Sequence, residues 1–202
     1  MILRAERIAQ LLKQGAAPDT SDPLVITPTP NIDELSKSGS ASVDLRLGTW
    51  FVSLRPARIA SLNIDEVTSE PKLTKCSYVP FGSSYYLHPG NFILGITLEW
   101  IRLPKTLAGY VVGKSSWGRR GLIIATATGV HPGFAGCLTL ELSNVGEIPI
   151  ELRPGIQVCQ ICLHSVEGKT TDDIDRSSYF GRRRPILGNI LLDDFAKKLS
   201  TS

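Results

Sequence analysis

Gly113-Lys-Ser-Ser-Trp-Gly-Arg-Arg-Gly121 and Gly136-Cys-Leu-Thr-Leu-Glu-Leu-Ser-Asn144 are the two segments that decide how this sequence is interpreted. In the second, every other residue is apolar, the period of a β-strand with one buried face. The shared apolar face would carry Leu138, Leu140 and Leu142. Glu141 then lies on the opposite face, where it either meets water or lines a site.

The first segment combines glycine, two hydroxyls and cations just where a preceding strand is expected to end. Backbone amides freed by glycine, together with Lys114, Arg119 and Arg120, suit an anion such as phosphate. A P-loop is excluded, because its first glycine would fall at Ala108. Two interpretations remain open from these residues alone, an ordinary basic turn and a phosphate site.

Length and composition place the chain among globular proteins of one domain. It has 202 residues, 42% hydrophobic and 20% charged, with a net charge of +3. This mild positive charge, without a dense basic face, predicts no nucleic-acid partner. No apolar run reaches membrane-spanning length, and the N-terminus is a poor signal peptide, so we expect a cytoplasmic protein without a membrane partner.

Short alternating segments separated by glycine and proline predict an all-β sandwich or jelly-roll-like barrel. A short amphipathic helix is expected over residues 1–14, ended by Gly15, and a second small helix is expected after residue 190. The expected strands cover 42–47, 50–54, 85–87, 92–103, 107–112, 122–127, 136–144, 148–152 and 157–163. The region 55–77 has no clear pattern.

The cysteines do not predict a metal site. Cys159 and Cys162 form a single Cys-x-x-Cys, and on a strand these two positions face opposite ways. His164 and Cys137 are conceivable partners, but buried free thiols are the simpler interpretation.

Several motifs occur together in a familiar order, and their combination resembles the dCTP deaminases of the dUTP pyrophosphatase superfamily. They are Ser42-Val-Asp-Leu-Arg-Leu-Gly, Tyr86-Leu-His-Pro-Gly, Gly113-Lys-Ser-Ser-Trp-Gly-Arg-Arg-Gly-Leu, Pro132-Gly-Phe-Ala-Gly, Leu140-Glu-Leu-Ser-Asn and Leu152-Arg-Pro-Gly. The resemblance covers about Met1 to Pro185. We therefore expect one domain over 1–185 and an extension with a short helix over 186–202.

The resemblance implies a distorted jelly-roll-like β-barrel that assembles as a homotrimer, with sites at subunit interfaces. It implies hydrolytic deamination of dCTP to dUTP and ammonia, feeding dUMP and thymidylate synthesis, with Mg²⁺ bound to the triphosphate and no zinc. The sequence agrees on zinc, because the zinc deaminases need an H-x-E motif and this chain has none.

The resemblance also implies roles for individual residues. Glu141 would activate the water, Ser115 would help hold it, and Arg119 would fix and polarise the site. A carboxylate with a raised pKa can take the proton from water and then deliver it to the ring and the leaving amine. The other expected nucleotide contacts are Lys114, Ser116, His131, Thr139, Leu140, Gln160, Tyr179 and Arg182.

Three positions depart from the family pattern. His131 replaces the usual turn aspartate, and Gly129 replaces an arginine that single-activity deaminases commonly carry. In the tail, Ser178 and Arg182 replace a lysine and a glutamine, although arginine can still clamp phosphate. Two alternatives to the deaminase therefore stay open: a dUTP pyrophosphatase, alone or as a second activity, and a non-catalytic nucleotide-binding trimer.

Overall fold

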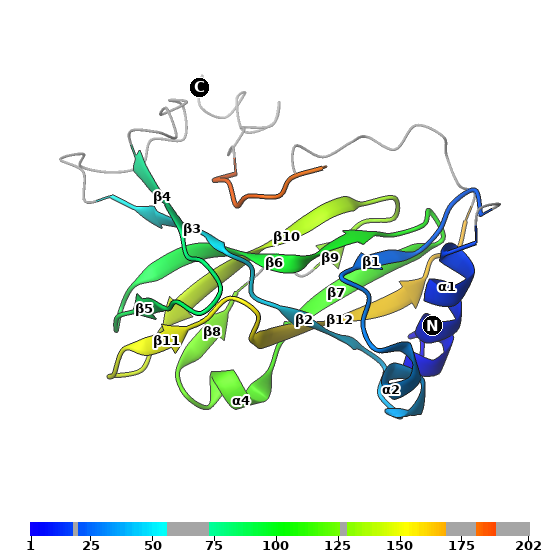
Figure 1. Cartoon of the computed structure of the whole chain (residues 1–202), viewed down its shortest axis with the longest axis horizontal. Coiled ribbons are helices and arrows are strands. Elements are labelled where there is room, and N and C mark those ends of the chain that lie inside the picture. The colour runs from blue at the N-terminus through cyan, green and yellow to red at the C-terminus, as the bar shows by residue number, and fades with distance from the viewer. Residues whose placement is uncertain (18–19, 56–72, 126–128, 169–180, 189–202) are drawn as a thin grey trace, which may run out of the picture.

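A computed structural model describes residues 1–17, 20–55, 73–125, 129–168 and 181–188. These residues form three antiparallel sheets with short helices at the edges, so the all-β prediction is confirmed (Figure 1). The described residues include no helix that is long and apolar enough to cross a membrane.

The helices of the described residues are α1 (Ala5–Gly15), α2 (Ile32–Lys37) and α4 (Ser115–Gly118). The strands are β1 (Val25–Thr27), β2 (Val43–Arg46), β3 (Trp50–Leu54), β4 (Thr74–Tyr78), β5 (Tyr85–Leu87), β6 (Phe92–Arg102), β7 (Leu107–Gly113), β8 (Leu122–Ile124), β9 (Gly129–Val130), β10 (Ala135–Asn144), β11 (Ile150–Leu152) and β12 (Gln157–Ser165).

The largest sheet has six strands in the order β4-β3-β6-β10-β8, with β1 also paired to β6. A second sheet has the order β2-β12-β7-β9, and β11 pairs with β5 in a third. The core is built from side chains that alternate inward along strands of these sheets. From β10 it takes the three leucines that the sequence pattern predicts: Leu138, Leu140 and Leu142, each at most 7% exposed.

Helix α1 packs its apolar stripe on this core. Ile8 and Leu12 are buried one turn apart, as the helical spacing predicts. The helix ends at Gly15, whose missing side chain matters, because a Cβ there would lie 2.6 Å from the carbonyl oxygen of Leu24. The predicted helix and its glycine end are confirmed.

The structure also differs from the sequence prediction. The expected basic turn after β7 contains the short helix α4, and strand β1 lies in a segment where no strand was predicted. Helix α2 was missed, although Asn31 caps it by accepting from the amides of Asp33 and Glu34. The unassigned 55–77 region ends in β4. Strand β8 stops at Ile124, and the helix expected after residue 190 lies outside the described residues.

Candidate active site

Strand β10 carries Glu141 and Thr139 on a half-buried face. Glu141 lies opposite Leu94 of β6, and Thr139 lies opposite Ile96. Both apolar partners are nearly inaccessible to water, at 6% and 2% exposed. Glu141 is therefore a half-buried carboxylate set beside an apolar sheet surface.

Two different segments cover the outer edge of β10. Near its end, β8 pairs with residues 142–144, and the amide of Ala125 donates to the carbonyl oxygen of Glu141 at 2.9 Å. Near its start lies the C-terminal segment 181–188. The amide of Gly181 donates to Ala135 at 2.6 Å, and the amide of Cys137 donates to Arg182 at 2.9 Å. Residues 138–140 lie between these two covered stretches.

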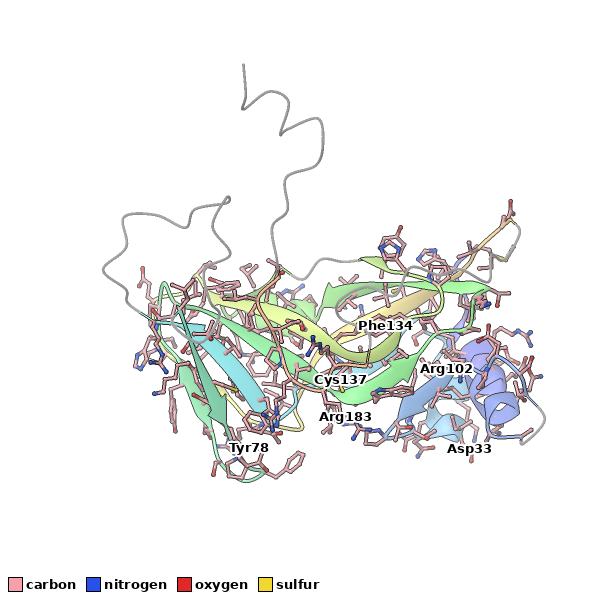
Figure 2. The ribbon with its side chains drawn as sticks, turned by 90° about the horizontal axis from the view of Figure 1, so that it is seen from above. Asp33, Tyr78, Arg102, Phe134, Cys137 and Arg183 are labelled. Atoms are coloured by element: carbon pink, nitrogen blue, oxygen red, sulfur yellow. The ribbon has the colours of Figure 1, made fainter. Side chains whose placement is uncertain are left out.

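The C-terminal segment brings a run of arginines, Arg182 to Arg184, to the face of the sheet that carries Cys137 (Figure 2). Figure 2 shows Arg183 close to Cys137 of β10. Burial raises the pKa of the Cys137 thiol, and the positive charge of Arg183 partly opposes that shift. The guanidinium carbon of Arg184 lies 4.0 Å from the ring centre of Trp50, a cation–π contact that holds the segment on β3.

Lys114 marks the corner where β7 turns into α4. Its amide donates to the carbonyl oxygen of Val158, and its ammonium donates to Asp44 Oδ2 at 2.7 Å and to Gln157 Oε1 at 3.1 Å. The indole of Trp117 also donates to the carbonyl oxygen of Gln157, at 2.8 Å. Lys114 therefore joins the corner to β2 and β12 in addition to carrying a charge that could meet phosphate.

The other expected residues of this corner face solvent. Ser115, Ser116 and Arg119 are all exposed on α4 and just after it. The loop then closes at Gly121, which has φ +88° and lies so near Gly146 that a Cβ would come within 2.7 Å of its amide nitrogen. Only glycine fits this position without strain, which explains why the motif 113–121 ends in glycine.

Register separates α4 from the middle of β10 within one chain. Leu122 pairs with Asn144, so α4 lies near the Asn144 end of β10, and Glu141 and Thr139 come earlier on the strand. In the part of the chain that the structure describes, no hydrogen bond or ion pair joins Glu141 to Ser115 or Arg119. The pairing of β8 with β10 therefore places the corner near the Asn144 end of the strand and does not join Ser115 or Arg119 to Glu141.

The remaining expected contacts are dispersed. Gln160 lies on β12, where its Oε1 accepts from Ser42 Oγ at 2.9 Å. His131 is exposed in the turn before β10, and its carbonyl oxygen accepts from the amide of Phe134. The side chain of Leu140 points into the core, and its backbone N–H and C=O face Gly95 of β6, so the expected contact of Leu140 with a ligand is not supported within one chain. Tyr179 lies outside the described residues.

The sequence analysis missed a buried acid, Glu99 of β6, which is 1% exposed. Its Oε2 accepts from the backbone amide of Arg46 at 2.8 Å, and its Oε1 accepts from Arg46 Nη1 at 3.0 Å. Burial raises the pKa of Glu99, and the hydrogen bonds and charge of Arg46 oppose that shift. A lone acid in the apolar run 92–103 was the available signal.

Metal ligation by side chains has no support among the described residues, which contain no group of three His, Cys, Asp or Glu side chains able to hold an ion. The four cysteines are free thiols. An ion carried by the phosphates of a nucleotide would not need such a group.

Comparison with known proteins gives one consistent result. Residues 2–166 match the family model described as dCTP deaminase-like. A protein of Dictyoglomus thermophilum named "dCTP deaminase, dUMP-forming" is 36% identical over 204 residues, which cover 98% of each chain. One of the same name from Kocuria rhizophila is 37% identical, over 81% of this chain and 79% of that protein.

A solved structure supports the fold. The 2'-deoxycytidine 5'-triphosphate deaminase of Agrobacterium tumefaciens superposes with a TM-score of 0.59 at 22% identity. The match covers 80% of this chain and 46% of that longer chain. At this identity the likeness concerns the fold alone, and it confirms the predicted fold class.

Proposed function

Because the chain belongs to the dCTP deaminase family, we propose that it catalyses hydrolytic deamination of dCTP. The observation that carries the proposal is Glu141 on the half-buried face of β10, beside the buried Leu94. A carboxyl group can take a proton from water and give it up again, and this one lies on a strand face that is only partly open to solvent.

In the proposed reaction, Glu141 takes a proton from a water molecule as the oxygen attacks C4 of cytosine. The same carboxyl group gives this proton to the ring nitrogen N3, then takes the second proton from the new C4 hydroxyl and passes it to the amine. The C4–N bond breaks as the carbonyl forms, and ammonia departs. Ser115 would hold the water and Arg119 would polarise the site. The backbone N–H and C=O of Thr139 would bind the pyrimidine edge, on the stretch of β10 between its two covered ends, whereas those of Leu140 face β6.

Phosphate binding is assigned to the β7–α4 corner and to the C-terminal segment. Ser116 and Arg119 are exposed there, and Arg182 lies on the segment that pairs with β10. Lys114 would meet phosphate only by turning from Asp44. Tyr179, His131 and Gln160 complete the proposed nucleotide contacts. Mg²⁺ would be carried by the triphosphate, where it neutralises charge.

The proposed site is completed by neighbouring copies in a homotrimer. One chain does not join Glu141 to Ser115 or Arg119 by any hydrogen bond or ion pair of its described residues. A second copy could supply the α4 corner to the β10 of the first. This arrangement would explain why α4 presents its hydroxyls and Arg119 outward.

The product we propose is dUMP, not the dUTP expected from the sequence. Relatives at 36% and 37% identity bear the name "dUMP-forming". Gly129 agrees with this choice, because single-activity deaminases resembling this chain commonly carry arginine there. The second step would be hydrolysis of the dUTP formed first, which breaks the bond between its α- and β-phosphates and releases dUMP and pyrophosphate. His131 is the residue to test for that step, since it stands where the family has an aspartate.

The test is incubation with Mg²⁺ and each of dCTP, dCMP, deoxycytidine and dUTP, with ammonia and pyrophosphate measured separately. The proposal predicts equal amounts of both from dCTP and neither from deoxycytidine. Ammonia without pyrophosphate would identify a single-activity deaminase. Pyrophosphate without ammonia would identify a dUTP pyrophosphatase, and binding without turnover would identify a nucleotide-binding protein.

A further inference from the structure

Strand β6 departs from regular pairing just before the proposed pyrimidine contact. Cys137 of β10 lies opposite Trp100, and Thr139 lies opposite Ile96. One residue of β10, Leu138, therefore faces three residues of β6, from Thr97 to Glu99. Such bulges bend a strand and leave backbone groups without their ordinary ladder partners.

The side chain of Thr97 fills the place of the missing partner. Its Oγ1 accepts from the amide of Leu138 at 2.9 Å and donates to the carbonyl oxygen of Glu99 at 2.9 Å. Thr97 is 1% exposed, so water cannot replace it readily. The hydroxyl satisfies two buried backbone groups that would otherwise be costly.

Thr97 is itself held from the opposite side of β6. Leu47 forms a bridge with Thr97, and the amide of Gly48 donates to the carbonyl oxygen of Ile96 at 2.7 Å. The next inward residue, Glu99, is fixed by both the backbone and the guanidinium of Arg46. The hydroxyl is therefore supported by a rigid corner between the two large sheets.

We propose that Thr97 is a positioning residue that sets the path of β10 through Leu138, and so aims the backbone N–H and C=O of Thr139 at the pyrimidine. This inference rests on the proposed function. The N–H and C=O of one strand residue point to one edge and those of the next residue point to the other, so fixing the Leu138 amide on the β6 side turns the N–H and C=O of Thr139 toward the outer edge. The Cys137 amide, bonded to Arg182 on that outer edge, fixes the preceding residue.

The test compares Thr97→Val, Thr97→Ser and Ile8→Val. Valine keeps the shape and the β-branched form but removes the hydroxyl, and serine restores the hydroxyl. Ile8, on α1, is fully buried away from β10 and loses one methyl group, which serves as a control for general loss of stability. Each variant is measured for kcat and KM with dCTP, for dCTP and dUTP dissociation constants, and for thermal midpoint.

We expect Thr97→Val to lower kcat/KM by about 10- to 100-fold, as small misplacements in a site do, and to weaken dCTP binding. Thr97→Ser should regain most of both. Ile8→Val should lower the thermal midpoint and leave KM unchanged. A Thr97→Val protein that loses stability but keeps the KM and dissociation constants of wild type would overturn the inference.

The proposed function can fail separately. If wild type releases no ammonia from dCTP yet binds dCTP or dUTP, the dissociation constants of the same variants decide the positioning role. A wild type that binds neither nucleotide overturns both the function and the inference.

Discussion

Arg46→Met should destabilise the fold through Glu99, and by an amount that depends on pH. The substitution removes the Nη1 donor that lies 3.0 Å from Glu99 Oε1. It keeps the backbone amide of residue 46, which lies 2.8 Å from Oε2. Methionine also keeps the apolar stem of the side chain, so that the main change is the loss of one charge beside a buried acid.

The size of the expected loss of stability follows from how deeply Glu99 and Arg46 are buried. Removing one partner of a buried ion pair costs about 3–5 kcal/mol. The Glu99 side chain is 1% exposed, but that of Arg46 is 37% exposed, so water screens part of the interaction. We therefore expect a loss of about 1–3 kcal/mol in the free energy of unfolding at neutral pH.

The sign of the pH dependence follows from the pKa of Glu99, which burial already raises. Loss of Arg46, which lowers it, should raise this pKa further. A carboxyl group whose pKa is higher in the folded protein contributes its full stabilisation of the fold below its unfolded pKa, which is about 4.3. That contribution is lost as the pH rises through the pKa of the folded protein. The destabilisation should therefore be small near pH 5 and larger near pH 8.

Urea unfolding at pH 5 and pH 8, at one fixed protein concentration, measures the effect. Arg153→Met is the matched control, because Arg153 pairs with Glu151 at 2.8 Å on the surface and its side chain is 60% exposed. The free energy of unfolding should fall less in Arg153→Met than in Arg46→Met. Equal losses for Arg46→Met at the two pH values, or no loss at all, would refute the reasoning.

Three further predictions concern the site. Lys114→Met should raise the KM for dCTP and also lower the thermal midpoint, because the Lys114 ammonium donates to Asp44 and Gln157. Steady-state kinetics and calorimetry measure the two quantities, and unchanged values of both would contradict this prediction. Elemental analysis should find no stoichiometric zinc, and activity should survive zinc-selective chelation but require added Mg²⁺; loss of activity with removal of a bound zinc would contradict this. His131→Asp should increase pyrophosphate release from dUTP, measured by a coupled assay; an unchanged rate would mean that His131 is only a turn residue.

The fold could be predicted well where local alternation decides it. The Leu138, Leu140 and Leu142 pattern fixed the inward face of β10, and Gly15 marked the end of α1. The predicted ends of the strands were less accurate, because hydrogen bonding to a neighbouring strand decides where a strand ends. The expected strand 122–127 has only Leu122–Ile124 in the ladder, opposite the end of β10.

The site could be predicted only in its parts. The motifs predict Glu141 and the α4 corner as parts of a site, but no local pattern shows that Lys114 contacts Asp44, 70 residues earlier in the chain. The Thr97–Leu138 contact was missed for the same reason, since a bulge depends on how two strands pair. Glu99 was visible as an acid in an apolar run, yet its partner Arg46 comes from another sheet.

The proposed role of Glu141 is tested most directly by ammonia release from dCTP in Glu141→Gln, with nucleotide binding measured on the same protein. Glutamine keeps the shape of the side chain but cannot accept the proton from water, so we predict that kcat falls by about 100- to 10,000-fold while the dissociation constant for dCTP stays near that of wild type. Glu151→Gln, on β11, which pairs with β5 in a different sheet from β10, should keep full activity. A Glu141→Gln protein that releases ammonia at most of the wild-type rate would contradict the account.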